Sequence, residues 1–111
     1  MVALKIVRNE EKWSEQARSE IKILQIILDK DFSDENCVIH MKDNFEFRGH
    51  VIITFELLST NLYELLKENS FQGLNLVHIR KMAIQMLSSI RLLRRLKIIH
   101  CDFKPENVML K

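Results

Sequence analysis

The chain opens with a β-branched run, Val2–Val7, whose side chains alternate between two faces with a period of two. This alternation predicts a strand. Lys5 shares a face with Ala3 and Val7, so a positive charge lies within a strand that otherwise has the pattern of a buried one.

From about Ser14 to Leu28 apolar residues recur at helical spacing, which predicts a helix. Ser14 is of the residue type preferred at helix N-caps and is the expected N-cap here. Glu20 lies at the edge of the apolar stripe of this helix. The stripe consists of Ala17, Ile21, Leu24 and Leu28.

The polar stretch 30–36 predicts a loop, and three short apolar runs at 38–41, 45–47 and 51–57 predict strands. The last two runs are separated only by Arg48-Gly49-His50. A connection this short that contains glycine favours an antiparallel hairpin.

Two helices and a final extended segment complete the pattern. Asn61 and Glu64 have the spacing of a capping box and predict a short helix that ends near Asn69. A longer helix is expected over 76–96, followed by a loop that Pro105 closes and a strand-like segment at 108–110. Strands first and helices later indicate an α+β fold. The apolar stripe of the longer helix is Ile79, Ala83, Met86, Ile90 and Leu93.

Composition narrows the class of protein. The chain has 111 residues, 47% hydrophobic and 29% charged, and a net charge of +2, so we expect one folded domain at most and no disorder. No apolar run approaches the roughly 20 residues that span a bilayer, so no membrane partner is expected. The small net charge gives no reason to expect nucleic acid as a partner. Cys37 and Cys101 form no CxxC pair, which favours a reducing compartment, cytoplasmic or nuclear.

The chemistry is concentrated near the C-terminal end. His100-Cys101-Asp102-Phe103-Lys104-Pro105-Glu106-Asn107 has the spacing of the protein-kinase catalytic loop, in which Asp and Asn lie five positions apart. Val2-Ala3-Leu4-Lys5 matches the kinase strand motif whose lysine binds nucleotide phosphates, and Glu20 is the expected helix partner of that lysine. The order and structural context of both motifs resemble a eukaryotic protein kinase.

The resemblance extends to one family. Five segments are similar to the dual-specificity tyrosine-phosphorylation-regulated kinases (DYRK family), and Cys101, where most kinases have arginine, is a specific mark of that family and its near relatives. The segments are 2–10, 55–58, 61–65, 71–73 and 98–102.

The resemblance implies a protein-kinase-like two-lobed fold, represented from the third small-lobe strand to the strand after the catalytic loop. Residues 1–58 are expected to form the small-lobe part and hinge, and 59–111 the start of the helical large lobe. No Gly-rich loop precedes Val2 and no Asp-Phe-Gly follows Lys111, so a partial kinase domain is expected.

The resemblance also implies roles for single residues. Lys5 would bind the ATP phosphates and Glu20 would hold it in place. Asp102 would accept or orient the proton of the substrate hydroxyl, Lys104 would steady the transferring phosphoryl group, and Asn107 would bind Mg²⁺, a hard cation that prefers oxygen ligands. An isolated lysine on a strand could equally extend its ammonium group to water, and only the joint motif favours the catalytic interpretation.

The remaining expected ATP-binding residues surround the adenine and ribose. Phe55 would be the gatekeeper, and backbone groups of the hinge would bind the adenine edge. Taken singly, each apolar residue of this set is more typical of an ordinary core strand. The hinge residues are Glu56, Leu57 and Leu58; Ala3 and Met109 would pack on the two faces of the adenine ring, and Asn61 would lie near the ribose.

The resemblance therefore implies a kinase that uses ATP and Mg²⁺ to phosphorylate Ser and Thr of protein substrates and a tyrosine of its own. A second hypothesis is a truncated, non-catalytic product that acts only by binding, or that has no function. Loss of the rest of the helical lobe would leave apolar surface exposed, which is the feature that keeps this alternative open.

Overall fold

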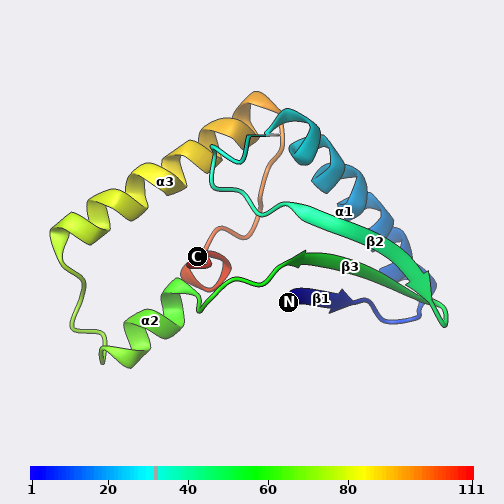
Figure 1. Ribbon diagram of the computed structural model, residues 1–111, viewed down its shortest axis with the longest axis horizontal. Coiled ribbons are helices and arrows are strands. Elements are labelled where there is room, and N and C mark those ends of the chain that lie inside the picture. The colour runs from blue at the N-terminus through cyan, green and yellow to red at the C-terminus, as the bar shows by residue number, and fades with distance from the viewer. Residues whose placement is uncertain (32) are drawn as a thin grey trace. The chain divides into compact units, whose positions relative to one another are not determined.

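The computed structural model describes residues 1–31 and 33–111 (Figure 1). The expected loop at 30–36 includes Phe32, which lies outside the described residues. The chain divides into two compact units, Met1–Leu57 and Leu58–Lys111, which are called the first and second unit below.

The first unit contains a three-stranded antiparallel sheet in the order β1-β3-β2, which confirms the expected hairpin. Its strands are β1 (Val2–Ile6), β2 (Met41–Phe47) and β3 (His50–Glu56). The prediction of a separate strand at 38–41 is wrong, because β2 begins only at Met41. In the register of β2 with β3 the first pair is Met41 with Phe55, so residues 38–40 belong to no strand of the described sheet.

Arg48 and Gly49 form the whole turn between β2 and β3. Both have positive φ, 50° and 77°, as a two-residue hairpin turn requires. A Cβ added at Gly49 would lie 2.5 Å from Nδ2 of Asn9, so glycine is needed here for space as well as for conformation. His50, expected in the turn, belongs to β3.

Helix α1 (Glu11–Lys30) runs beside β2 and β3 (Figure 1). The prediction of Ser14 as N-cap is wrong: Glu10 takes that position, and the Ser14 amide already donates to the Glu10 carbonyl as part of the first turn. A small core joins the helix and the sheet, and burial of its apolar side chains is the main force holding the unit together. The buried members of this core are Ala17, Leu24, Met41, Val51 and Ile53.

The second unit begins with α2 (Leu62–Glu68), and its expected cap is confirmed, since Asn61 Oδ1 accepts a 2.8 Å hydrogen bond from the Glu64 amide. A 3-10 helix, Pro105–Asn107, packs near α2. The expected strand at 108–110 is reduced to a single antiparallel bridge between Asn61 and Met109.

Helix α3 (Leu76–Arg95) has the expected extent, with Leu96 as its C-cap. Lys97 follows in the left-handed region at φ 57°, and the Ile98 amide closes the end of the helix by donating to Leu93 O at 2.9 Å.

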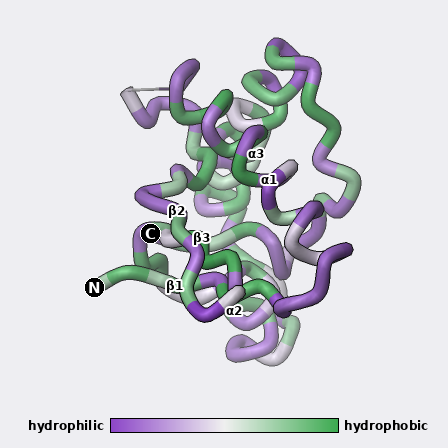
Figure 2. Tube along the Cα trace, turned by 90° about the vertical axis from the view of Figure 1, so that its right-hand side faces the viewer, coloured by the Kyte–Doolittle hydropathy of each residue, from purple (hydrophilic) through white to green (hydrophobic). Residues whose placement is uncertain are grey.

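Hydrophobic and hydrophilic colours alternate along α3 (Figure 2). The expected stripe is only partly buried, because Ile79 and Ile90 remain 42% and 41% exposed. Among the described residues of the second unit, α3 packs against neither α2 nor the 3-10 helix.

Candidate active site

The lysine of β1 and the glutamate of α1 meet in the first unit. Lys5 Nζ donates to both carboxylate oxygens of Glu20, at 2.6 and 2.7 Å. Strand alternation places Lys5 on the sheet face that carries Ile53, its cross-strand partner, and α1 covers that face. The sequence pattern therefore brings together the two residues expected to hold nucleotide phosphates.

Two further expected ATP-binding residues face each other across β1 and β3. Ala3 and Phe55 are cross-strand partners, and both are half-buried. Phe55 packs against the core of the unit. Glu56 ends β3, and the expected hinge continues through Leu57, which is exposed, to Leu58, which is half-buried.

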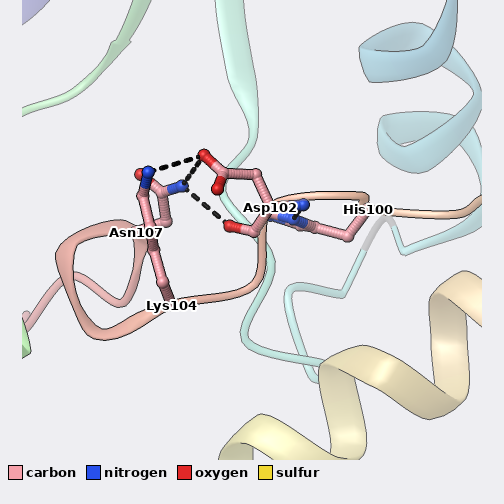
Figure 3. Close-up of polar contacts among 4 residues, drawn as sticks. All are labelled: His100, Asp102, Lys104 and Asn107. Atoms are coloured by element: carbon pink, nitrogen blue, oxygen red, sulfur yellow. Dashed lines mark hydrogen bonds and ion pairs between the residues drawn. The ribbon is translucent and has the colours of Figure 1, made fainter.

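A second group of polar side chains surrounds Asp102 in the second unit (Figure 3). Lys104 Nζ lies 2.9 Å from Asp102 Oδ2. Asn107 Nδ2 donates to the same Oδ2 at 3.1 Å and to the Asp102 carbonyl at 2.9 Å. The three residues expected to act in catalysis thus form one cluster around a single carboxylate.

The backbone of this loop turns sharply at Cys101, whose φ is 66°. A non-glycine residue in the left-handed region carries a conformational cost, which the surrounding contacts must offset. The Asp102 amide donates to His100 Nδ1 at 3.2 Å, and the rings of His100 and Phe103 meet edge to face. His100 therefore orients the backbone of Asp102, a role that the sequence spacing alone did not indicate.

The cluster favours the charged form of Asp102. The hydrogen bond from Lys104 lowers the pKa of the Asp102 carboxyl below its ordinary value of 3.8, and the hydrogen bond from Asn107 acts in the same direction. The same contact raises the pKa of Lys104. Asp102 is therefore an anion at neutral pH, as a residue that accepts or orients a proton must be.

Asn61 and Met109, expected near ribose and adenine, are paired in the second unit. The backbone bridge between them is flanked by the Leu62 amide, which donates to Val108 O at 2.8 Å, and by the Leu110 amide, which donates to Thr60 O at 2.8 Å. Asn61 Oδ1 caps α2, so this oxygen already accepts a hydrogen bond from the Glu64 amide. Met109 is 43% exposed.

A third polar group lies at the C-terminal end of α1 and was not expected. Asp31, Asp34 and His40 each offer a ligand atom within 4.8 Å of the others. Asp31 is buried, and its two oxygens already accept hydrogen bonds from Asn36 Nδ2 at 2.6 Å and His40 Nε2 at 3.3 Å. We interpret this group as the structural support of the loop before β2. The only signal in the sequence was an aspartate soon after the expected helix.

Within the described residues, no helix combines the length and apolar character needed to cross a membrane.

Comparison with known proteins identifies the family. Residues 1–111 match the family model of the protein kinase domain. The chain is 54% identical to the dual specificity tyrosine-phosphorylation-regulated kinase mbk-2 of Caenorhabditis elegans, over 99% of this chain and 14% of that protein. It is 50% identical to the dual specificity tyrosine-phosphorylation-regulated kinase 4 of Homo sapiens, over 99% of this chain and 21% of that protein. It is also 50% identical to a probable serine/threonine-protein kinase, dyrk2, of Dictyostelium discoideum, over 100% of this chain and 12% of that protein.

These matches confirm the expected fold class, a fragment of the protein kinase fold, and they span a minor part of each relative. The strand with Lys5, the helix with Glu20 and the loop with Asp102 all lie inside the matched range. The chain therefore belongs to the protein kinase family, as a partial kinase domain similar to those of the dual-specificity tyrosine-phosphorylation-regulated kinases.

Proposed function

We propose that this chain is part of an ATP- and Mg²⁺-dependent protein kinase that phosphorylates Ser and Thr of protein substrates and a tyrosine of its own. The observation that carries the proposal is the Asp102 carboxylate, contacted by both Lys104 and Asn107. The relatives are named as dual-specificity and serine/threonine-protein kinases, and these names support Ser, Thr and Tyr hydroxyls as the groups that receive the phosphate.

The residues suit the charge changes of phosphoryl transfer. Asp102, kept ionised by Lys104, would accept the hydrogen bond of the substrate hydroxyl. It would take the hydroxyl proton as the bond from that oxygen to the γ-phosphorus of ATP forms and the bond from the γ-phosphorus to the β–γ bridging oxygen breaks, so that ADP leaves. Lys104 would also offer positive charge to the transferring group. Because catalysis here depends mainly on position and charge, a cluster fixed by mutual hydrogen bonds is well suited to it.

The donor set also fits the expected cofactors. Asn107 directs its Nδ2 group to the Asp102 carboxylate, and the carboxamide oxygen of the same side chain is the type of ligand that Mg²⁺ prefers. Mg²⁺, when bound, neutralises charge on the phosphates. Lys5 would bind ATP phosphates, and the two contacts from Glu20 would limit the positions that its ammonium group can take.

A chimaera tests the proposal. The 110-residue matched segment of the C. elegans relative would be replaced by the corresponding segment of this chain, and phosphate transfer from labelled ATP to a generic protein substrate would be measured. We expect Mg²⁺-dependent labelling of Ser and Thr, and no labelling by the matched Asp102→Ala chimaera. A folded chimaera that binds an ATP analogue but transfers no phosphate would refute the proposal.

A further inference from the structure

Helix α3 carries an unbalanced positive charge. Its 20 residues include Lys and Arg but no Asp or Glu, and the stretch without acidic residues extends over 69–101. None of these cations forms an ion pair with a residue that the structure describes, so the charge of the helix is not neutralised by ion pairing within that part of the chain. The cations of α3 are Arg80, Lys81, Arg91, Arg94 and Arg95.

Three of these cations lie along one exposed line of the helix. Residues three or four positions apart share a helix face, and a line with this spacing runs along α3 through exposed residues only. We call it the basic face, and it consists of Arg80, Ile84, Leu87, Arg91 and Arg95. Ile84 and Leu87 are 60% and 64% exposed. The basic face therefore has an aliphatic centre between cationic ends, over a length of about 22 Å.

The helix dipole does not account for this charge. Cations near a helix C-terminus are stabilised by the dipole, but the effect falls off within the last turn. It explains Arg94 and Arg95, which lie in the last turn, and it does not explain Arg80 or Arg91. Arg91 also lies four positions before Arg95, and like charges at this spacing repel each other. A ligand with negative charge would relieve this repulsion.

We infer that the basic face of α3 binds an acidic amphipathic helix of another protein. Aliphatic side chains of the partner helix pack on Ile84 and Leu87, and carboxylates on either side of them pair with Arg80 and Arg91. Arginine suits such pairs, because its planar guanidinium group binds a carboxylate through two parallel hydrogen bonds. The inference does not depend on kinase activity, since no residue of the basic face is assigned to ATP or to catalysis.

Two other anionic surfaces fit the basic face less well. Single-stranded nucleic acid is bound by cations together with aromatic side chains on which the bases stack, and the basic face contains no aromatic residue. A helix that lies on a membrane needs a broad apolar face, whereas the basic face has only two aliphatic side chains between its cations. An acidic helix with a short aliphatic centre matches both the charge and the spacing.

Binding of a defined helical probe tests the inference. The probe is a fluorescein-labelled, alanine-based peptide of about 20 residues. It carries two Leu three positions apart and a Glu four positions outside each of them, so that it repeats the spacing of the basic face. The probe is titrated with the 111-residue chain, and fluorescence anisotropy is recorded. We expect saturable binding that weakens as the salt concentration rises.

Variants of α3 locate the contact. Arg91→Glu is expected to weaken binding about tenfold, because an attraction becomes a repulsion. Leu87→Ala is expected to weaken it several-fold through lost apolar contact. Arg91→Gln and Gln85→Glu form a matched pair, since each lowers the charge of the helix by one, and Gln85 is exposed outside the basic face. We expect a loss of about threefold for Arg91→Gln and an affinity within about 1.5-fold of the parent for Gln85→Glu.

An exchange of charges separates direct pairing from the general positive field of the helix. A second probe has Lys in place of both Glu residues and is expected to bind the parent at least about tenfold less tightly. Arg91→Glu should bind this second probe more tightly than the parent does, because the new carboxylate faces an ammonium group. Circular dichroism establishes that each variant is folded, and Arg91→Gln replaces Arg91→Glu in the first titration if the latter does not fold.

The inference is overturned if no saturable binding occurs, or if Arg91→Gln and Gln85→Glu weaken binding equally. It is also overturned if a folded Arg91→Glu variant binds the second probe no better than the parent does. Sedimentation that shows an Arg91-dependent dimer would overturn it in favour of a second copy of this chain. Tighter binding to phosphatidylserine vesicles or to a single-stranded oligonucleotide than to the first probe would overturn it in favour of that occupant.

Discussion

Lys5 and Glu20 form a two-point contact between β1 and α1, although they lie fifteen positions apart in the sequence. Their side chains are 49% and 36% exposed, and ion pairs with this much access to water contribute little to stability. The contact is therefore better explained by positioning of the lysine ammonium group than by its effect on folding.

Glu20→Gln separates these two roles. We expect the free energy of unfolding to change by less than about 1 kcal/mol, while kcat/KM for ATP of the chimaera falls about tenfold, since the lysine loses its charged partner. Arg18→Gln is the matched control, because it removes a comparable exposed ion pair, with Glu46, from the same helix. Equal losses of kcat/KM in both variants would show that Glu20 has no special role.

Asp102→Asn tests the proposed proton acceptor. The variant keeps the size of the side chain but cannot take a proton, so kcat of the chimaera should fall by about 10²–10⁴-fold. Nucleotide affinity should stay within a few-fold, because Lys5 and the hinge, which would hold ATP, are unchanged. Steady-state kinetics and nucleotide titration measure the two quantities separately. A large loss of nucleotide affinity with little change in kcat would contradict the assignment.

Periodicity and capping predicted most of the elements because these signals are local. The cap of α2 by Asn61, the hairpin at Gly49 and the extent of α3 all depend on neighbours within a few residues. The start of α1 was missed because Glu10 caps it through its backbone alone, and this contact has no residue-type signal. The strand expected at 38–41 was wrong because a strand needs a partner distant in the sequence, and pairing with β3 begins only at Met41.

The candidate site likewise could be predicted only where a local sequence motif marks it. A motif of fixed spacing identified Asp102, Lys104 and Asn107, and the structure places them in one cluster. By contrast, a groove lined by Lys22 of α1 and Phe45 of β2 combines elements that a loop separates, and no sequence motif marks it. Sites made by packing of distant segments require the tertiary structure.

Asp31 makes stability depend on pH. Burial raises the pKa of its carboxyl, but the hydrogen bonds from Asn36 and His40 outweigh this effect, and the net pKa is lowered from 3.8. A lowered folded-state pKa gives stabilisation that is present above the unfolded pKa and is lost as pH falls through the folded pKa. Urea unfolding of the chain should therefore show stability decreasing below about pH 4.

Asp31→Asn should remove part of this decrease and cost about 1–3 kcal/mol at neutral pH, because two hydrogen bonds to a charged acceptor are lost. Asp29→Asn is the control, since Asp29 is exposed in the last turn of α1, which Asp31 follows, and accepts a hydrogen bond from Gln25. An Asp31→Asn variant with the parent's pH profile would exclude Asp31 as the source.

Lys97, the residue after the C-cap of α3, has a conformation that favours glycine. Its φ is 57°, and the Lys97 amide donates to Arg94 O at 3.1 Å. Lys97→Gly should stabilise the chain by about 0.5–1 kcal/mol, because the left-handed conformation costs a lysine more than a glycine. Urea unfolding measures the change. Arg91→Gly, at an exposed position inside the same helix, should instead destabilise by about 1 kcal/mol, and a loss of stability in both variants would contradict the explanation.

The isolated 111-residue polypeptide should not transfer phosphate. It holds Lys5, Glu20, Asp102 and Asn107, but phosphoryl transfer in kinases also requires a Gly-rich cover over the phosphates and a second metal-binding aspartate, and its sequence contains neither motif. The support of the Asp102 loop is also weak. Asp102 and Lys104 are 62% and 46% exposed, whereas catalytic groups must be held within roughly 0.5 Å by packed neighbours.

We therefore expect weak nucleotide binding at most and no turnover above background from this polypeptide, while the chimaera with the C. elegans relative is active. The measurement is label transfer from ATP to a generic protein substrate, with protein purified free of host kinases and an Asp102→Ala polypeptide beside it. The comparison separates the site from its surroundings, because both proteins contain the same proposed catalytic residues. Transfer by the isolated polypeptide that Asp102→Ala abolishes would show that these residues suffice without the rest of a kinase domain.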